Sequence, residues 1–518
     1  MNNKNLVTMI ALIVALGGLL MGFDASVISG VVKFIEVEFS LSKLEIGWAV
    51  ACLTLTATLA MMIAGPISDA IGRRTVLRYA AILYAISAIW SALATSFTTL
   101  VIARMIGGLG VGASLILAPM YIAEISPAAL RGRMVSFNQL NIVIGISLAF
   151  FTNYLILQWA KLDVSWALSL GFDKYTWRWM LGLETLPAIL YFIGLFFVPR
   201  SPRWLLLKGH VDEATDVMSK YTGEEEASKQ IATIQQSLKE QQNKEKAKLN
   251  ELFKPSLKLV LTIGVVIAIL QQITGINSVF FYAPMIFEQS GIGTDASFVQ
   301  AILVGLTNLI FTVVAMVLID KLGRKPLLSF GVGGIAVCMF ILAYGFSSAE
   351  YSLKEDSIQN LQSVESIEKL EPILGEVYHS DVEFKAAIEK LVGTEILTSN
   401  ESTFIKEGIS MNPTLILIGI LGFVASFAMS LGPVMWVLFS ELFPNNIRGL
   451  AISFVGLINS AVSFGVQWIF PWELATLGSA TTFLIYGCFA VAGLVFTIRV
   501  IPETKGKSLE ELEAQLVN

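Results

Sequence analysis

Asp24 and Arg104 each stand inside a long apolar stretch of this 518-residue chain. At the centre of a membrane helix, either charge costs about 2.5–3.5 kcal/mol on insertion scales. Each of the two side chains is therefore expected to find a partner. A carboxylate paired with an arginine in such surroundings is either a group that takes up and releases protons or a static structural ion pair.

Side-chain amides mark other apolar stretches, at Gln271, Gln272, Asn277, Asn308 and Asn459. A pair of Gln in a membrane helix is costly unless it faces a partner or a cavity. Amides that face a cavity can hydrogen-bond a polar substrate, and the alternative for each is a hydrogen bond between helices. Gly275 and Pro284 lie close to three of these amides and allow their helix to break and move.

Composition indicates that membrane helices position these residues. Of the chain, 55% is hydrophobic and 14% is charged, with a mean hydropathy of +0.71, whereas soluble proteins carry about 25% charged residues. This composition excludes a disordered chain, a nucleic-acid binder and a secreted disulfide scaffold. The three Cys lie in apolar stretches and the two His lie outside them. We therefore expect no metal site, no cofactor and no enzyme.

Twelve apolar stretches are long enough to cross a bilayer core of about 30 Å, which needs roughly 20 helical residues. They cover about 6–30, 47–67, 76–96, 99–123, 134–157, 178–198, 259–288, 299–319, 327–346, 413–438, 450–471 and 479–501. Lys and Arg gather in one set of short connections, which we place in the cytoplasm together with both termini. The first stretch is too long for a signal peptide, so we expect it to remain as a membrane helix.

An internal repeat divides the chain. Residues 69–74 resemble 320–325 at an offset of 251 residues, and residues 124–132 resemble 441–449 at an offset of 317. The difference of 66 residues nearly equals the acidic segment 347–411. We therefore predict two six-helix halves, 1–200 and 259–501, with cytoplasmic linker helices over 201–258 and a short cytoplasmic tail over 502–518. Residues 347–411 are predicted to form an acidic helical insertion that caps the outer face.

Charged residues at the cytoplasmic ends of the repeated helices predict a network that closes the inner side of the protein when the outer side is open. Arg and Asp in the repeated turns can pair across helix ends, and the Glu and Arg that follow can pair with neighbouring helices. The alternative is orientation by positive charge together with helix capping. The members are Asp69, Arg73, Arg74, Glu124, Arg131, Asp320, Arg324, Glu441 and Arg448.

With these motifs the chain resembles the sugar porter family of the major facilitator superfamily, and most of all its bacterial proton-coupled sugar symporters. The matching segments are 22–30, 69–74, 104–112, 121–133, 199–205, 271–277, 320–326, 432–436, 441–449 and 502–506. They cover nearly the whole chain apart from the insertion. The resemblance implies an all-α membrane protein of twelve transmembrane helices in two halves, which moves a monosaccharide by alternating access.

The resemblance also implies which residues carry the function. Amides bind the sugar hydroxyls and aromatic rings cover its apolar faces, and packing is the alternative for the rings. The sugar-binding candidates are Gln271, Gln272, Asn277, Asn308, Trp436, Asn459, Phe23 and Tyr282. In the proton-coupled members Asp24 and Arg104 pair, with Glu184 as a candidate third member. Protonation of Asp24 would release Arg104 and bias the arrangement of the helices.

The chain departs from the family pattern at four positions. Arg200 replaces the Glu of the usual Pro-Glu-Ser-Pro-Arg motif, which alters one arm of the cytoplasmic network. Ile146 stands where a sugar-binding Gln is usual in helix 5. Asn459 and Ser460 stand where the xylose symporter has Gln and Trp. These changes leave the particular sugar open.

Taken together, the sequence predicts a secondary active transporter that imports a monosaccharide with a proton. We expect an integral protein of the bacterial inner membrane that contacts the lipid bilayer, works as a monomer and binds no nucleic acid. One alternative is an uncoupled sugar facilitator. Another is a non-transporting sugar receptor, a class that typically adds a long cytoplasmic signalling tail.

Overall fold

The computed structural model describes residues 3–127, 130–243, 248–361, 364–444, 447–507 and 509–516. Within these ranges ten helical segments are long and apolar enough to cross a membrane. The longest, α21 (Arg448–Val500), consists of two helices that meet at Gly478, where φ is +79°. Two shorter helices, α7 (Thr176–Gly182) and α8 (Thr185–Gly194), occupy the predicted 178–198 stretch. The predicted all-α fold with twelve crossings is therefore confirmed.

The helices group into two compact units. The first unit contains Met1–Ser26, Cys52–Ala149 and Arg178–Ala247, and the second contains Val27–Ala51, Phe150–Trp177 and Lys248–Asn518. The division therefore passes through α1 (Asn3–Glu38), α2 (Lys43–Ile71) and α5 (Arg131–Trp159). The halves predicted from the sequence follow chain order instead, and their boundaries stay a prediction.

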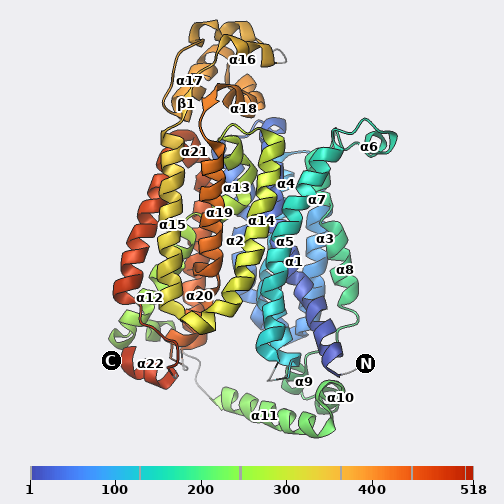
Figure 1. Cartoon of the computed structure of the whole chain (residues 1–518). Coiled ribbons are helices and arrows are strands. Elements are labelled where there is room, and N and C mark those ends of the chain that lie inside the picture. The colour runs from blue at the N-terminus through green and yellow to red at the C-terminus, as the bar shows by residue number, and fades with distance from the viewer. Residues whose placement is uncertain are drawn as a thin grey trace. The chain divides into compact units, whose positions relative to one another are not determined.

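In the first unit, α3 (Arg73–Ala92) packs against α4 (Phe97–Ile125) and α8. The first part of α1 meets α5 through glycines: a Cβ atom on Gly22 would lie 1.9 Å from the carbonyl oxygen of Ile142. Three helices follow the crossings, α9 (Pro202–Leu207), α10 (Val211–Thr222) and α11 (Glu224–Asn243), and they lie near the N-terminus (Figure 1). Their apolar faces join the core of this unit through Leu205, Ala214 and Ile231.

In the second unit, α15 (Arg324–Ser347) packs against α19 (Pro413–Met429) and α21, and α12 (Lys258–Ile273) also packs against α21. The remaining long helices are α13 (Ile276–Glu288), α14 (Thr294–Leu322) and α20 (Leu431–Leu442). Short elements complete the unit: α6 (Ser165–Leu170), the 3-10 turns η1 (Leu249–Phe253) and η2 (Pro255–Leu257), and α22 (Leu509–Leu516).

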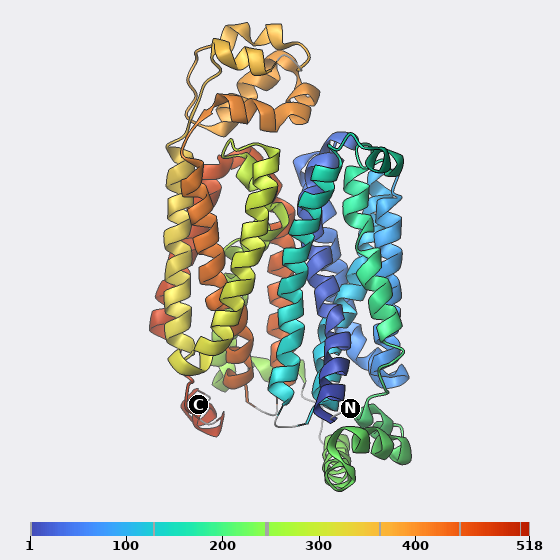
Figure 2. The same ribbon diagram turned by 45° about the vertical axis from the view of Figure 1, so that its right-hand side comes forward.

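The insertion forms a small layer at one end of the second unit's helices, while α22 lies at the other end (Figures 1 and 2). It contains α16 (Glu355–Asn360), the 3-10 turn η3 (Ile367–Ile373), α17 (Asp381–Val392) and α18 (Thr394–Gly408). Strands β1 (Glu350–Tyr351) and β2 (Ile409–Ser410) pair antiparallel where the insertion leaves and rejoins the helices. Its own apolar core includes Tyr351, Leu370, Phe384 and Phe404. The predicted acidic helical insertion is thus confirmed.

Candidate functional site

Two broken helices place the amides in the second unit. Gly275 separates α12 from α13 with φ +89°, and the ring of Tyr486 lies so close that a Cβ atom there would be 2.5 Å from it. Ser430 separates α19 from α20 with φ −126° and ψ −93°. Breaks of this kind free backbone groups inside a membrane protein and are found where the chain lines a substrate path.

Four of the five predicted amides hydrogen-bond one another. Gln272 donates from Nε2 to Gln271 Oε1 at 3.1 Å and to Asn459 Oδ1 at 3.2 Å. Asn459 donates from Nδ2 to Gln271 Oε1 at 2.8 Å, and Asn277 donates from Nδ2 to Gln272 Oε1 at 2.7 Å. All four belong to α12, α13 or α21. We call Gln271, Gln272, Asn277 and Asn459 the amide cluster.

Two further residues of α21, Ser463 and Gln467, extend the amide cluster and were not predicted from the sequence. Ser463 Oγ accepts a hydrogen bond of 2.7 Å from Asn277 Nδ2 and another of 2.7 Å from Gln467 Nε2. Asn459, Ser463 and Gln467 follow one another at four-residue intervals, which places them on one face of a helix. That spacing is the signal that could have identified them.

The other predicted sugar-binding residues have different surroundings. Asn308 is buried on α14 and makes no hydrogen bond to the amide cluster within the described residues. Tyr282 is fully buried, and its hydroxyl donates to the backbone oxygen of Gln467 at 2.9 Å. The indole of Trp436 is 49% exposed and meets Phe439 edge-on. Phe23 is buried in the first unit.

The predicted charged residues meet in the first unit. Arg104 Nη1 lies 3.4 Å from Asp24 Oδ1, and both residues are 2% exposed. Glu184 is equally buried and interacts electrostatically with both. Asp24 Oδ2 and Glu184 Oε1 accept no hydrogen bond from the described residues. Arg104 thus pairs with Asp24, and Glu184 adds a second buried acid to the same unit. A buried carboxylate is costly unless it is paired or protonated.

Small residues of α3 and α4 make room for Asp24. A Cβ atom on Gly107 would lie 3.0 Å from Asp24 Oδ2 and 2.5 Å from Ser87 Oγ. A side chain at position 107 would therefore push the carboxylate away. Ile146 is half-buried on α5, one residue after Gly145, whose Cβ atom would lie 2.1 Å from the Leu19 carbonyl oxygen. Ile146 thus sits beside the close crossing of α1 and α5.

The first unit contains one arm of the predicted cytoplasmic network. Arg73 binds Asp69 Oδ1 through Nη1 at 2.6 Å and Glu124 Oε1 through Nε at 3.3 Å. Ser201 donates its hydroxyl to the other oxygen of Glu124. Arg73 and Glu124 have side chains that are less than a tenth exposed, so this ion pair is buried.

The second unit repeats that arm. Arg324 Nη2 binds Glu441 Oε1 at 2.8 Å, and Thr504 Oγ1 donates to Glu441 Oε2 at 2.5 Å. Glu503 also accepts from the backbone N–H groups of Arg324 and Lys325, at 3.1 Å each. Burial favours a raised pKa of Glu503, but hydrogen bonds from four backbone N–H groups lower it below its usual value. Glu503 thereby caps the N-terminus of α15.

Four predicted members of the network take other positions. Arg74 donates to the backbone oxygen of Val198 at 3.0 Å, and Arg448 donates to that of Phe443 at 3.0 Å. Neither makes an ion pair with a described side chain, and the same holds for Arg131, which is exposed. The side chain of Asp320 lies outside the part of the chain that is described. The partners Ser201, Glu503 and Thr504 in the two arms were not predicted from the sequence, although all three lie within the segments that match the family.

The two sites support different chemistry. Neutral amides both donate and accept hydrogen bonds, so the amide cluster can exchange its internal bonds for bonds to a polyhydroxyl molecule. The Asp24–Arg104–Glu184 group can exchange a proton. Among the described residues, no group of three or more His, Cys, Asp or Glu is arranged to hold a metal ion.

A comparison with protein families matches residues 10–362 and 391–516 to the family described as "Sugar (and other) transporter". The unmatched residues 363–390 lie inside the insertion. The arabinose-proton symporter of Bacillus subtilis (strain 168) is 34% identical over 512 residues, which cover 99% of this chain and 95% of that protein. The D-xylose-proton symporter of Escherichia coli (strain K12) is 35% identical over 544 residues, covering 99% and 96%.

Solved structures give the same result. The inward open conformation of the xylose transporter from Escherichia coli matches with a TM-score of 0.75 and 32% identity, covering 98% of this chain and 100% of that one. A proton:xylose symporter bound to 6-bromo-6-deoxy-D-glucose matches with a TM-score of 0.68 and 34% identity, covering 99% and 100%. All of these descriptions name transporters, which confirms that the chain is not an enzyme.

Proposed function

Because the chain belongs to the sugar transporter family, we propose that it imports a monosaccharide together with a proton by alternating access. Two of its relatives are named as proton symporters, one for arabinose and one for D-xylose. The observation that carries the proposal is the buried pair of Asp24 and Arg104 with Glu184 beside it. An uncoupled facilitator has no need of such a costly group.

The proton part of the proposal rests on one change of charge. With Asp24 ionised, its carboxylate holds Arg104 across the interface of α1 and α4. A proton on Asp24 removes the attraction and frees the guanidinium to turn toward Glu184. The helices then favour a different arrangement, and the proton is released when that arrangement exposes Asp24 to the cytoplasm.

The sugar part rests on the amide cluster. Without sugar, its members bond one another, so no buried donor is left without an acceptor. The hydroxyls of a sugar can take over these hydrogen bonds. An amide donor or acceptor that stayed buried without a partner would be costly. Asn308, Trp436, Tyr282 and Phe23 are proposed as further contacts. The sugar itself is not specified, since Ile146 lacks the amide usual in helix 5.

The chain is an integral membrane protein. We place it in a bacterial inner membrane, with both termini, the 201–258 linker and the 502–518 tail in the cytoplasm and the 347–411 insertion outside. The excess of Lys and Arg in the corresponding short connections supports this orientation. We further propose that the two six-helix halves, 1–200 and 259–501, form one functional monomer.

Purified protein in liposomes tests the proposed function. Exchange of labelled sugars from a panel of pentoses and hexoses identifies the substrate without any proton gradient. Uptake of that sugar is then measured with an imposed gradient, acidic outside. We expect accumulation well above the outside concentration and a rise in external pH when sugar is added. Uptake that stops at equal concentrations would instead establish the uncoupled facilitator.

A further inference from the structure

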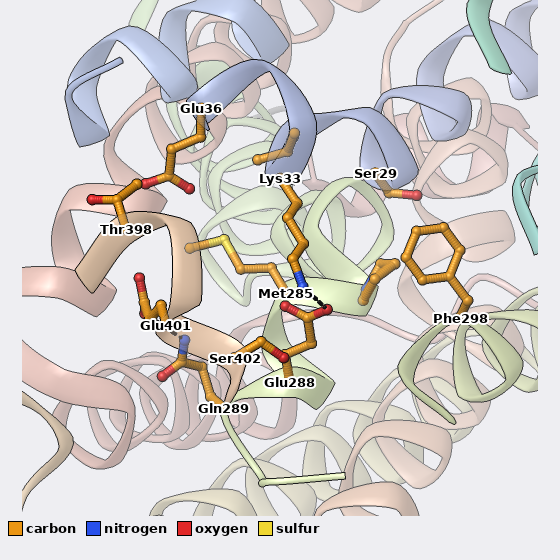
Figure 3. Close-up of a pocket in the computed structure, with 12 residues that line it drawn as sticks. Ser29, Lys33, Glu36, Met285, Glu288, Gln289, Phe298, Thr398, Glu401 and Ser402 are labelled. Atoms are coloured by element: carbon orange, nitrogen blue, oxygen red, sulfur yellow. Dashed lines mark hydrogen bonds and ion pairs between the residues drawn. The ribbon is translucent and has the colours of Figure 1, made fainter. Parts of the chain in front are cut away.

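The insertion contacts more than the helices from which it emerges. Within the second unit, the outer ends of α1 and α2 lie against α13, α14 and α18, and charged side chains join them. Lys33 of α1 binds Glu288 of α13 at 3.0 Å and Thr294 of α14 at 2.6 Å. Figure 3 shows Lys33 reaching Glu288 across a small cavity, with Glu401 of the insertion beside Gln289.

Glu401 is the centre of these contacts. It accepts from Lys385 at 3.1 Å and from Gln289 Nε2 at 3.0 Å, and it lies 3.5 Å from Lys43 Nζ. Lys43 is the first residue of α2 and also binds Glu36 of α1 at 2.6 Å. A single carboxylate in the insertion therefore joins α17, the residue that follows α13 and the first residue of α2.

The insertion is also fixed on its other side. Asp381, at the start of α17, accepts a hydrogen bond of 3.2 Å from Ser479, next to the break in α21 at Gly478. A Cβ atom on Gly478 would lie 2.8 Å from Asp381 Oδ1. Within the second unit, the insertion thus contacts the bend of α21 on one side and the ends of α1 and α2 on the other.

Electrostatics keep Glu401 charged. Burial alone would raise its pKa, but Lys385, Lys43 and the hydrogen bond from Gln289 hold that pKa well below its usual range. The side chains of Glu401, Lys385 and Lys43 are all less than a third exposed, so salt screens them incompletely. The cavity beneath them has a volume of about 40 Å³. That volume is enough for a few water molecules.

We propose that the insertion is a component of the outer gate, and that its Glu401 binds Lys43 to hold the outer ends of α1 and α2 in the outward-closed state. The inference rests on the proposed function, because alternating access requires these contacts to break when sugar enters from outside. The partner of this insertion surface is the α1–α2 turn of the same chain. The insertion thereby sets the balance between outward-open and outward-closed molecules.

Labelling of a cysteine in the cavity tests the gate without requiring transport. Ser29 lines the cavity and is 4% exposed. In a Ser29→Cys protein that also carries Cys338→Ala and Cys488→Ala, a membrane-impermeant maleimide added to intact cells reports outward opening. We expect Glu401→Gln to raise the labelling rate about 1.5- to fivefold, the range that weak, partly exposed ion pairs contribute. Lys43→Gln should act in the same direction.

The double variant and a control make the result decisive. If Glu401 and Lys43 act through their contact, the two substitutions together raise the rate by less than the product of their separate effects. Glu407→Gln is the matched control, because Glu407 lies on the same helix but bonds Asn360 within the insertion. It should leave the rate unchanged.

Two results would overturn the proposal: unchanged labelling in both folded single variants, or effects that multiply independently. Folding is checked by expression in the membrane and by the melting temperature in detergent. The outcome is separate from that of the proposed function. Labelling that changes as expected in a protein without sugar uptake supports the gate and rejects the transport proposal.

Discussion

The first unit gathers charge at its buried centre, whereas the second unit gathers neutral amides. Asp24, Arg104 and Glu184 bring two acids to one base in the first unit. Gln272, Gln271 and Asn459 form a hydrogen-bonded group without any ionised member in the second. Proton binding requires a titratable group, while neutral amides can both donate hydrogen bonds to sugar hydroxyls and accept them. This difference is the basis for our proposal that the proton binds in the first unit and that the amides of the second unit bind the sugar hydroxyls.

The two arms of the predicted cytoplasmic network differ much less between the units. Arg73 with Glu124 in the first unit matches Arg324 with Glu441 in the second, and a hydroxyl from Ser201 or Thr504 completes each pair. The same kind of Arg–Glu pair thus recurs in both units, although their buried centres differ. The two units differ at one matching position. Glu503 caps α15 in the second unit, whereas its counterpart in the first unit, Arg200, binds Glu213 of α10.

The largest expected effect concerns the amide cluster. Gln272→Ala removes a side chain that hydrogen-bonds three other amides. One hydroxyl of the bound sugar then has no hydrogen-bond partner. We expect sugar binding to weaken by about 1–3 kcal/mol, measured by titration of the purified protein. Ser463→Ala removes an acceptor of Asn277 and should weaken sugar binding less than Gln272→Ala does. Unchanged affinity in a folded Gln272→Ala protein would remove the amide cluster from the sugar site.

The ion pairs in the two arms of the predicted cytoplasmic network are expected to contribute differently to stability. A neutral Gln can still accept a hydrogen bond from the arginine, but it loses the charge-assisted part. Glu124→Gln should therefore lower stability by about 1–2 kcal/mol, and Glu441→Gln by about 1 kcal/mol because its ion pair is more exposed. Melting temperatures in one detergent provide the comparison. Equal losses would show that burial does not distinguish the two arms.

The smallest effect concerns the helix cap that only one unit has. Glu503→Gln should destabilise the protein by about 0.3–1 kcal/mol, the range for a charge at a helix N-terminus. Because the pKa of Glu503 is lowered in the folded protein, its contribution is complete above the pKa of the unfolded chain and is lost as the pH falls through the folded value. The difference in melting temperature should persist from about pH 8 to 5 and shrink below about pH 4.

A gain in stability of about the same size is expected from a substitution in the first unit. Arg200→Glu restores the carboxylate at the position that matches Glu503, next to the N-terminus of α3. It removes an exposed ion pair with Glu213, of a kind that contributes little, and a contact of the guanidinium with the Trp204 ring at 6.0 Å. The melting temperature should rise slightly. A fall would mean that repulsion from Glu213 outweighs the cap.

Much of the fold followed from the sequence because apolar length and repeated motifs are strong local signals. The cost of a buried charge was enough to predict that Asp24 and Arg104 find partners. The family resemblance was needed to pair them with each other. The four amides could be selected because an amide in an apolar helix needs a partner. In each case, the neighbouring residues alone show that the charged or amide side chain lies in an apolar helix and therefore needs a partner.

Other contacts had no such signal. Glu401 and Lys43 are polar residues in polar segments, 358 positions apart, so nothing local indicates that they meet. Strands of two residues, such as β1 and β2, are too short for any periodicity. Ser463 and Gln467 were overlooked because each is unremarkable until Asn459 is known to face Gln272. Arg131 and Arg448 were assigned ion pairs from motif position alone, and the described side chains offer them none.

The central claim is that Asp24 carries the proton and the amide cluster carries the sugar. Asp24→Asn keeps the shape of the side chain but cannot titrate. In liposomes, this variant should bind sugar and exchange labelled for unlabelled sugar. It should fail to accumulate sugar above the outside concentration under a pH gradient that drives accumulation by the unmodified protein. Gradient-driven accumulation by Asp24→Asn would contradict the account.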